Sequence, residues 1–501
     1  MIQPVSAIID GRTITAAAGP PIAVIDPASA DTIVTIAEAD EALVDRAVQS
    51  ARRAFAQDAW QQTDVEAREA LLRACADRID AAGDELARIE TANTGIPLAQ
   101  VRDRQVARAS RNFRFFADYI GQSAGELYEQ DANYLTFVRR EPVGVAALIA
   151  PWNAPIALGS MKIAAAVAFG NSCVIKPSEQ APLGVCRLVE LLQEILPPGL
   201  VNLVVGRGAT TGDRLVRHEE INLVSFTGGT ATGRMIMAAA GQGLKPVTME
   251  LGGKSANIIF DSADFEQALD AALLGIFTAN GQQCLAGSRI LVQRGIADRF
   301  IEAFVARARA IRIGHPLEPE TELGPLISRR HLEHVLSFVP EAGRTDVRLL
   351  TGGRRAAGFA KGYYIEPTAV LLDRIEDRIC QDEIFGPFAA FTIFDTAEEA
   401  YRLANGTRFG LVSYVWSQDI ATIMEAQDRL SSGIVWCNTP MTRELRAPFG
   451  GFGDSGVGAE GGRACEAFYT RQKTVSIPRR PLKLGKLGRL EDPIREAAMR
   501  D

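Results

Sequence analysis

The spacing of hydrophobic and polar positions changes along the chain. Between residues 40 and 120, charged residues alternate with Ala and Leu at helical spacing, which predicts several amphipathic helices. From Val143 onward, short apolar runs at 143–150, 172–176, 201–206, 223–226 and 247–251 alternate with helical segments at 157–170, 182–194 and from about 231. Short apolar strands between helices are typical of a parallel sheet, so about five strands of a doubly wound sheet are predicted.

A second alternation follows residue 253. Helical segments are expected at 265–280, 295–312, 328–339 and 396–405, and strands at 288–292, near 347–350, at 389–394 and at 433–438. This pattern predicts a second α/β domain. The sequence contains no internal repeat and no low-complexity segment.

Length and charge narrow the class of protein. At 501 residues and 54.0 kDa the chain exceeds what one hydrophobic core supports, so two large domains are expected. The net charge of −7 and the pI near 5.5 argue against a nucleic-acid partner. The most apolar region, from Val143 to Phe169, is interrupted by prolines and by Lys162, so no membrane span is predicted. No signal peptide is recognisable at the first residues, and a cytoplasmic location is expected.

The cysteines point to one candidate nucleophile. There are seven, at 75, 173, 186, 284, 380, 437 and 465. Their odd number and the absence of CxxC pairs indicate reduced thiols, with no disulfide framework and no metal site. Cys284 follows a predicted helix between Gly281 and Gly287, where a thiol can be reached. The alternative is an ordinary core cysteine.

A carboxylate is the candidate base for this thiol. A Cys–His protease is poorly supported, because the histidines lie in charged or loop-like stretches away from the glycine-rich motifs, at 218, 315, 331 and 334. Glu250 ends an apolar strand before Gly252 and Gly253, and such strand ends face the ligand crevice of a doubly wound sheet. A partly buried glutamate has a raised pKa and can act as a general base. A surface glutamate is the alternative.

An amide group lies in the first strand-to-helix turn. Asn153 is held between Pro151 and Pro155, which stiffen the loop. A rigidly held amide can donate a hydrogen bond to a developing oxyanion, an effect of roughly 3–4 kcal/mol elsewhere. Ordinary turn chemistry is the alternative.

The signals for a nucleotide are indirect. The first strand-turn-helix lacks GxGxxG, the usual dinucleotide fingerprint. A later strand runs into Gly228-Gly-Thr-Ala-Thr-Gly233, which opens a helix and places backbone N–H groups where a pyrophosphate could sit. After the second strand comes Lys176-Pro-Ser-Glu179, and an acid there suits ribose hydroxyls, favouring NAD over NADP. A helix N-cap at Ser178 is the alternative.

Seven segments, in this order and spacing, resemble the aldehyde dehydrogenase superfamily across nearly the whole chain. They are Pro151–Pro155, Lys176–Glu179, Phe226–Gly233, Met249–Lys254, Gly281–Cys284, Glu383–Pro387 and Pro448–Gly451. The resemblance implies an α/β protein with a doubly wound parallel-sheet NAD-binding domain (1–124 and 143–252) and a second α/β catalytic domain (253–454). It also implies a small β oligomerisation element (125–142 and 467–483), in which a strand at 467–477 pairs with residues near 125–142 to build a homodimer or homotetramer.

The resemblance also assigns roles to residues. It makes Cys284 the nucleophile and Glu250 the general base, with Asn153 and the Cys284 N–H group as the oxyanion hole. Lys162 and Glu460 match positions associated with active-site hydrogen bonding or proton relay. Lys176 and Glu179 would bind the adenosine ribose, and Glu383 and Phe385 the nicotinamide ribose and ring. The full set implied for NAD is Ala150, Pro151, Trp152, Lys176, Ser178, Glu179, Phe226, Gly228, Gly229, Gly233, Leu251, Gly252, Glu383 and Phe385.

One departure concerns the phosphate loop. The family often has Ser after the first glycine, whereas this chain has Gly229, so pyrophosphate binding would rest on backbone donors. The implied mechanism is thiolate attack on an aldehyde, hydride transfer to NAD and hydrolysis of the thioester. Glu250 favours hydrolysis over transfer to coenzyme A. A non-catalytic NAD-binding or structural protein is the alternative of another class.

The stretch from Asn438 to Gly451 resembles the branch that oxidises hydroxymuconic and related semialdehydes in aromatic-ring catabolism. Such a substrate bears a carboxylate, which a guanidinium holds through two parallel hydrogen bonds. Arg446 and Arg108 match arginines of that branch, and solvated arginines are the alternative for each. The tail beyond Ser476 is longer than expected and rich in Lys and Arg, which leaves neutral aromatic or aliphatic aldehydes open.

Overall fold

The computed structural model describes residues 3–129, 131–340, 344–485 and 487–488. The chain divides into two compact units, Met1–Gln122 with Pro142–Thr470, and Ser123–Glu141 with Arg471–Asp501. The larger unit contains two extensive β-sheets and the helices that cover them.

The first sheet has eight strands in the order β2-β1-β9-β8-β7-β10-β11-β21. Its five central strands, from β9 to β11, are parallel and are the five that the apolar runs predict. They are β7 (Val145–Ala150), β8 (Ser172–Pro177), β9 (Val201–Val204), β10 (Leu223–Thr227) and β11 (Val247–Glu250). The edge strands β1 (Ala7–Ile9), β2 (Arg12–Ile14) and β21 (Gly456–Val457) run antiparallel to their neighbours.

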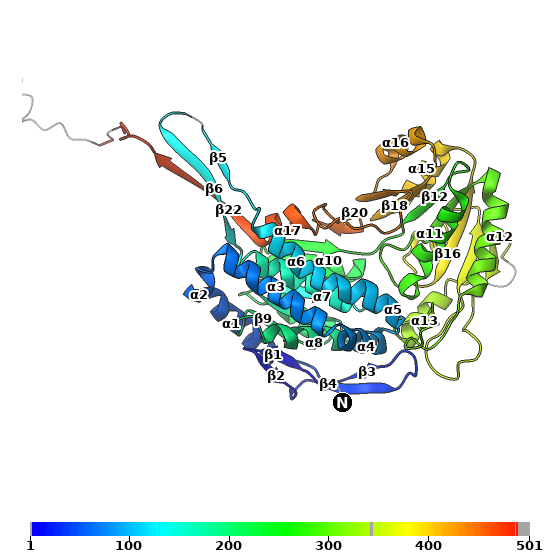
Figure 1. Ribbon diagram of the computed structural model, residues 1–501, viewed down its shortest axis with the longest axis horizontal. Coiled ribbons are helices and arrows are strands. Elements are labelled where there is room, and N and C mark those ends of the chain that lie inside the picture. Colours follow the sequence, from blue (N-terminus) through cyan, green and yellow to red (C-terminus); the bar gives the residue numbers. More distant parts are fainter. Residues whose placement is uncertain (1–2, 130, 341–343, 486, 489–501) are drawn as a thin grey trace, which may run out of the picture. The chain divides into compact units, whose positions relative to one another are not determined.

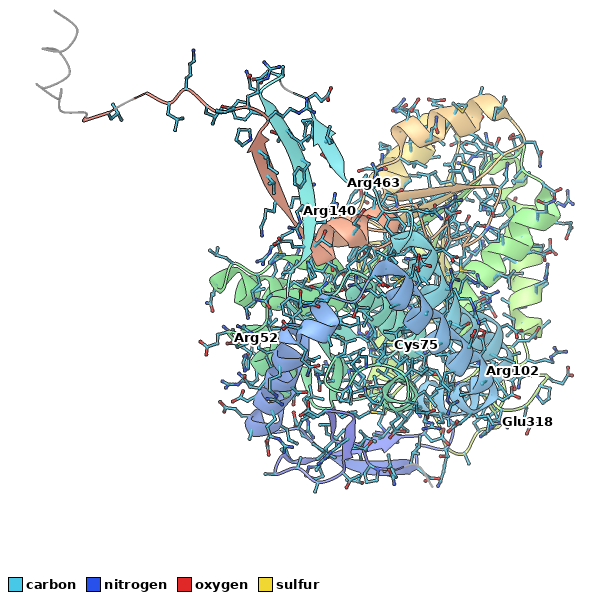
Figure 2. The ribbon with its side chains drawn as sticks, turned by 60° about the vertical axis from the view of Figure 1, so that its left-hand side comes forward. Arg52, Cys75, Arg102, Arg140, Glu318 and Arg463 are labelled. Atoms are coloured by element: carbon cyan, nitrogen blue, oxygen red, sulfur yellow. The ribbon has the colours of Figure 1, made fainter. Side chains whose placement is uncertain are left out.

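Helices cover both faces of this sheet. Alternate residues of its strands point to opposite faces and pack into two different hydrophobic cores. Ile175 of β8 packs with α3 (Val65–Ala81), α4 (Gly83–Thr94), α6 (Ala107–Ile120), α7 (Pro155–Ala168) and α8 (Leu183–Gln193). Val174 packs instead with α1 (Glu41–Ala56), α9 (Asp213–Arg217) and α10 (Thr230–Gln242). Figure 1 shows α3, α6 and α7 side by side over the sheet, and Cys75 of α3 lies within this helical layer in Figure 2. The sheet is therefore doubly wound, as predicted.

The second sheet has seven strands in the order β14-β15-β16-β13-β12-β18-β19. All neighbours are parallel except β14 and β15. The strands are β12 (Ala256–Ile259), β13 (Arg289–Gln293), β14 (Val347–Thr351), β15 (Thr368–Leu372), β16 (Phe388–Phe394), β18 (Val412–Trp416) and β19 (Ile434–Cys437). The sequence pattern does not predict β12, β15 and β18.

Helices also cover both faces of the second sheet (Figure 1). Ile290 packs with α11 (Phe265–Phe277) and α12 (Arg294–Ala310), whereas Leu291 packs with α13 (Arg329–Leu336), α14 (Arg378–Gln381), α15 (Ala397–Asn405) and α16 (Ile420–Arg429). The predicted α/β class with two parallel-sheet regions is confirmed.

Shorter elements complete the larger unit. They are α2 (Asp58–Gln61), α5 (Leu98–Gln100), α17 (Gly462–Tyr469), the paired strands β3 (Pro21–Ile25) and β4 (Thr32–Ala37), and β17 (Phe409–Gly410) with β20 (Phe452–Gly453). Two π-helical turns, η1 (Val101–Val106) and η2 (Gly208–Gly212), and the 3₁₀ turn η3 (Thr278–Gly281) adjoin longer helices. Within the described residues, no helix has the length and apolar character needed to cross a membrane.

The smaller unit is a three-stranded sheet in the order β22-β6-β5. Its strands are β5 (Glu126–Tyr128), β6 (Tyr134–Pro142) and β22 (Thr470–Pro478). The strand expected from residue 467 begins instead at Thr470, because residues up to Tyr469 belong to α17.

Candidate active site

Two cavities meet at one small group of residues. The cavity of about 440 Å³, here called the arginine cavity, is lined by Arg104, Arg108, Arg111 and Arg443 among others. The cavity of about 420 Å³, here called the glycine cavity, is lined on one side by Gly228, Gly229 and Gly252. The residues that line both are Asn153, Leu158, Thr227, Glu250 and Cys284. A molecule in either cavity would therefore reach the same thiol, carboxylate and amide.

A left-handed turn delivers Cys284 to this junction. After α11, Ala279 and Asn280 adopt φ values of 51° and 59°, which are uncommon for residues other than glycine. The buried side chain of Asn280 fixes the turn, since its Nδ2 donates to the Gly95 and Pro325 carbonyls and its Oδ1 accepts from the Gly324 N–H group. The loop that carries Cys284 is thus anchored to the protein interior by side-chain hydrogen bonds.

Cys284 is the cysteine that lines the two cavities. It is half-buried, whereas five of the other six are buried in the cores. Burial raises the pKa of its thiol to about 12, helped by Glu383 and Glu250, while the positive charge of Arg108 opposes the shift. The thiol is protonated at neutral pH in this state, so it needs a proton acceptor before it can attack.

Glu250 ends β11 at this junction and is buried. Burial raises its pKa well above 4.5, and the nearby charge of Glu460 adds to the shift. Glu460 is itself held ionised: burial raises its pKa, but Lys162 and Arg443 outweigh burial and lower it. Lys162 Nζ donates to Glu460 Oε1 at 2.7 Å and to Ser225 Oγ at 2.8 Å, and all three side chains are buried. The sequence-predicted Glu250, Lys162 and Glu460 therefore come together in one buried group.

Asn153 lies beside the cysteine loop. Its side-chain Nδ2 donates to the Gln282 backbone carbonyl at 2.9 Å. The backbone carbonyl of Asn153 accepts a hydrogen bond from Gln105 Nε2 at 3.4 Å. An amide nitrogen carries two hydrogens, so one bond to Gln282 leaves a second N–H for another acceptor. The structure thus places Asn153 beside the loop that carries Cys284, and its part in an oxyanion hole stays a prediction.

Aromatic side chains form one wall of the glycine cavity. The rings of Trp152 and Phe385 have centroids 5.2 Å apart, and the His331 ring lies 5.2 Å from Trp152. His331 Nε2 lies 2.6 Å from the carbonyl of Phe385, whose φ is 58°. Burial lowers the pKa of His331 to about 4, so its ring is neutral and Nε2–H donates this bond. His331 was not predicted as a site residue, because nothing in its helical stretch signals this contact.

The lining of the glycine cavity also includes an open helix N-terminus. Gly229 is the N-cap of α10, no side chain caps the helix, and nothing lies within 4 Å of where a Cβ at Gly229 would be. Free N–H groups at a helix N-terminus attract an anion. Glu383 also lines this cavity, and its Oε1 accepts from the Gly253 N–H group at 3.0 Å. A Cβ at Gly252 would lie 2.3 Å from Glu383 Oε2, so a larger residue there would displace the Glu383 carboxylate.

The implied NAD-binding residues divide into two groups. Those lining the glycine cavity are Pro151, Trp152, Gly228, Gly229, Leu251, Gly252, Glu383 and Phe385. Those outside its lining are Ala150, Lys176, Ser178, Glu179, Phe226 and Gly233. Phe226 is buried in the sheet core, and Gly233 lets α10 pack on Leu251, so a contact of these two residues with NAD stays a prediction. Ser178 does not cap α8, which begins at Leu183, whereas the buried Lys176 lies 3.7 Å from Glu179.

Two arginines project into the arginine cavity without an anionic partner. Within the described chain, Nε and Nη2 of both Arg108 and Arg443 are buried and donate no hydrogen bond. Burial and the charge of Arg443 lower the pKa of Arg108 to about 9, so Arg108 stays charged at pH 7. The expected placement of Arg446 at the substrate mouth is wrong: its side chain is 78% exposed and pairs with Glu444 at 2.9 Å. Arg443, three residues earlier, occupies that place and was missed.

Known proteins are similar to this chain over nearly its whole length. The model of the aldehyde dehydrogenase family matches residues 14–475. The 5-carboxymethyl-2-hydroxymuconate semialdehyde dehydrogenase of Escherichia coli is 42% identical over 443 residues, which are 87% of this chain and 93% of that protein. A betaine aldehyde dehydrogenase of Cereibacter sphaeroides is 40% identical over 478 residues, covering 95% and 98%.

The fold of this chain is also similar to solved structures. The crystal structure of PnpE from a Pseudomonas species in complex with nicotinamide adenine dinucleotide superposes with a TM-score of 0.94 at 40% identity. It covers 97% of this chain and 100% of that one. Because the family model matches most of the chain, including all residues that line the two cavities, the chain belongs to the aldehyde dehydrogenase family.

Proposed function

We propose that this enzyme oxidises an aldehyde that carries a carboxylate, with NAD⁺ as the hydride acceptor. The observation that carries the proposal is the junction of two cavities at Cys284, Glu250 and Asn153. One cavity suits the aldehyde and the other suits the nucleotide, so both would meet the same thiol. A non-catalytic binding protein would have no need for this convergence.

The glycine cavity fits NAD⁺ at several points. The uncapped N-terminus of α10 at Gly229 suits a pyrophosphate, and the rings of Trp152 and Phe385 suit the flat nicotinamide. The Glu383 carboxylate would accept hydrogen bonds from ribose hydroxyls. Lys176 and Glu179 remain the proposed contacts of the adenosine ribose, and the carboxylate there disfavours the extra phosphate of NADP.

The chain's own groups support a thiol-based mechanism. Cys284 would give up its proton to an acceptor, for which Glu250 is the adjacent carboxylate, and its sulfur would bond to the aldehyde carbon. Asn153 Nδ2 and the Cys284 N–H group would donate to the oxygen as it becomes negative. When bound, NAD⁺ accepts a hydride from that carbon.

Release of the acid would then depend on Glu250. In its ionised form it takes a proton from water, the water oxygen bonds to the acyl carbon, and the Cys284 sulfur leaves. The buried pair of Lys162 and Glu460 lies next to Glu250 and would help to pass the proton on. Because water completes the reaction, no coenzyme A is required.

The carboxylate of the substrate is inferred from Arg108 and Arg443. Their buried nitrogen atoms have no partners in the described chain, and leaving buried cations unpaired is costly unless an anion arrives. A carboxylate would satisfy both through charge-assisted hydrogen bonds. A cationic aldehyde would be repelled by the same groups, which disfavours a betaine-type substrate. Neutral aromatic or aliphatic aldehydes are the remaining alternative.

We also propose that the three-stranded sheet of the smaller unit packs against another copy of the chain. Along β22 most residues are exposed, and Leu127 and Tyr128 of β5 are 60% and 52% exposed. A small sheet with little burial gains stability when a second surface covers it. Light scattering of the full chain tests this: a homodimer or homotetramer supports the proposal, and a monomer at micromolar concentration contradicts it.

NADH absorbance tests the substrate class directly. The purified enzyme is assayed with NAD⁺ or NADP⁺ on 2-hydroxymuconic semialdehyde, benzaldehyde and hexanal, using Cys284→Ala as the inactive control. In Arg443→Gln, the preference for the semialdehyde over benzaldehyde should fall about 10- to 100-fold, as expected for loss of a charge-assisted pair. Arg446→Gln is the matched control, because Arg446 is exposed and outside the cavity. Equal loss on both aldehydes, or the same loss in both variants, would overturn the carboxylate assignment.

A further inference from the structure

Unpaired positive charge continues outward from Arg108 along the same helical segment. Arg104 lies in η1 and Arg111 in α6, and both line the arginine cavity. Both are exposed, whereas the Nε and Nη2 atoms of Arg108 are buried. The charge of Arg111 is close enough to Arg108 to lower its pKa. Arg104 and Arg111 therefore form an outer pair of cations beside the inner pair of Arg108 and Arg443.

Two neighbouring arginines of the same segment form ion pairs with aspartates, whereas the outer pair does not. Arg102, two residues before Arg104, lies 3.0 Å from Asp84 and points to the outer surface of the helices (Figure 2). Arg114, three residues after Arg111, pairs with Asp77 at 2.6 Å and Asp80 at 2.7 Å. In the parts of the chain that the structure describes, neither Arg104 nor Arg111 makes an ion pair or a side-chain hydrogen bond.

The acidic groups of the arginine cavity do not balance these cations. Glu460 is already bonded to Lys162, and burial raises the pKa of Glu250, which favours its neutral form. Asp103 is the other carboxylate in the lining, and like its neighbour Arg104 it forms no ion pair in the described chain. The lining therefore carries a clear excess of positive charge, although the protein as a whole has a net charge of −7. A concentrated field of this kind attracts anions and orients them.

We propose that Arg104 and Arg111 form an outer subsite for a second carboxylate, so that the preferred substrate is a dianionic aldehyde. This inference rests on the proposed function, in which Arg108 and Arg443 hold the first carboxylate. The inner pair is buried and binds through hydrogen bonds, whereas the outer pair is exposed and acts through screened attraction. Discrimination by the outer pair is accordingly smaller and depends on salt.

The experiment compares aldehydes that differ in charge. Hexanal, 6-oxohexanoate and 3-(carboxymethyl)-6-oxohexanoate carry no, one and two carboxylates. The measured quantity is the ratio of kcat/KM for the dicarboxylate to kcat/KM for the monocarboxylate. In the double variant Arg104→Gln/Arg111→Gln this ratio should fall about 5- to 20-fold, mainly through KM, and the remaining preference should lose its salt dependence.

The control variant is Arg102→Gln, which removes a paired arginine of the same segment outside the cavity and should leave the ratio unchanged. An unchanged ratio in the double variant, or an equal fall in Arg102→Gln, would overturn the outer subsite. Failure of the proposed function looks different: the wild-type enzyme would then treat hexanal and 6-oxohexanoate alike. Thermal unfolding of each variant verifies that the exposed substitutions leave the fold intact.

Discussion

Lys162 Nζ donates a hydrogen bond of 2.7 Å to Glu460 Oε1, joining residues that lie 298 positions apart in the sequence. Both side chains are buried, and each would be costly to bury alone. Pairing with Lys162 keeps Glu460 ionised beside Glu250. The negative charge of Glu460 adds to the effect of burial in raising the pKa of Glu250. The link between these groups therefore bears on the pH at which Glu250 can act as a base.

Replacing Glu460 should move the pH dependence of turnover. The base is the ionised form of Glu250, so activity rises as pH increases through its raised pKa. Glu460→Gln removes the charge that helps to raise this pKa, so the acid limb of the kcat profile should shift to lower pH. The limb stays above pH 4.5, because burial is the larger cause and persists. A limb that stays in place or moves to higher pH would contradict the coupling.

Glu90 should make the fold less stable as pH rises. This carboxyl of α4 is buried, accepts a hydrogen bond from the Ile156 N–H group at 2.9 Å, and has its pKa raised by burial to about 8. Between about pH 4.5 and pH 8 it is protonated in the fold and ionised in the unfolded chain. The folded state then binds more protons, so this group lowers the free energy of unfolding by on the order of 1 kcal/mol per pH unit.

Glu90→Gln should remove that dependence, because the amide keeps an acceptor for Ile156 and does not ionise. Tm is measured across this pH range for the wild type, for Glu90→Gln and for Glu66→Gln, an exposed glutamate on α3. The Tm advantage of Glu90→Gln should grow with pH, and Glu66→Gln should follow the wild type. An advantage that is constant or shrinks with rising pH would show that Glu90 is ionised in the fold.

Gly229→Ser should tighten NAD⁺ binding. The backbone at Gly229 has φ −70° and ψ 144°, which suits serine, and the space around its Cβ position is open. A hydroxyl there can donate to a pyrophosphate oxygen, and a hydrogen bond to a charged group lowers Kd by about 5- to 10-fold. Titration calorimetry with NAD⁺ measures this. A Kd equal to or weaker than that of the wild type would place the pyrophosphate away from the α10 N-terminus.

The parallel strands were predictable where burial on both faces leaves a continuous apolar run, as in Val145–Ala150. Strand β12 was not predicted, because its apolar run is very short. The polar Asn257 is its second residue, and the strand begins only two residues after the Gly252–Lys254 loop. The predicted strands also placed Glu250 at the end of one strand and Asn153 in the turn that follows another. A strand can therefore be predicted from its sequence when all its residues are buried and form a long apolar run.

The arginine that reaches the cavity could not be chosen from sequence. Arg443 and Arg446 are three residues apart in a loop without regular structure, where Asn438 and Met441 adopt φ values of 51° and 48°. No helical or strand period tells which side chain points inward in such a loop. In the structure, Glu444 pairs with Arg446 and holds it at the surface. Arg443 lies over the Phe449 ring at 4.1 Å and lines the cavity.

Trapping the acyl group on Cys284 tests the central claim most directly. Glu250→Gln is mixed with NAD⁺ and a carboxylated aldehyde, and intact mass and NADH are followed together, with Cys284→Ala/Glu250→Gln as control. Loss of the base slows release of the acid by about 10²- to 10⁴-fold. Because Glu250 also accepts the Cys284 proton, the acyl group should form slowly in Glu250→Gln. The expected result after long incubation is one equivalent of NADH and a mass increase equal to a single acyl group, located at Cys284 and absent from the control. A mass increase that persists without Cys284, or wild-type turnover in Glu250→Gln, would contradict it.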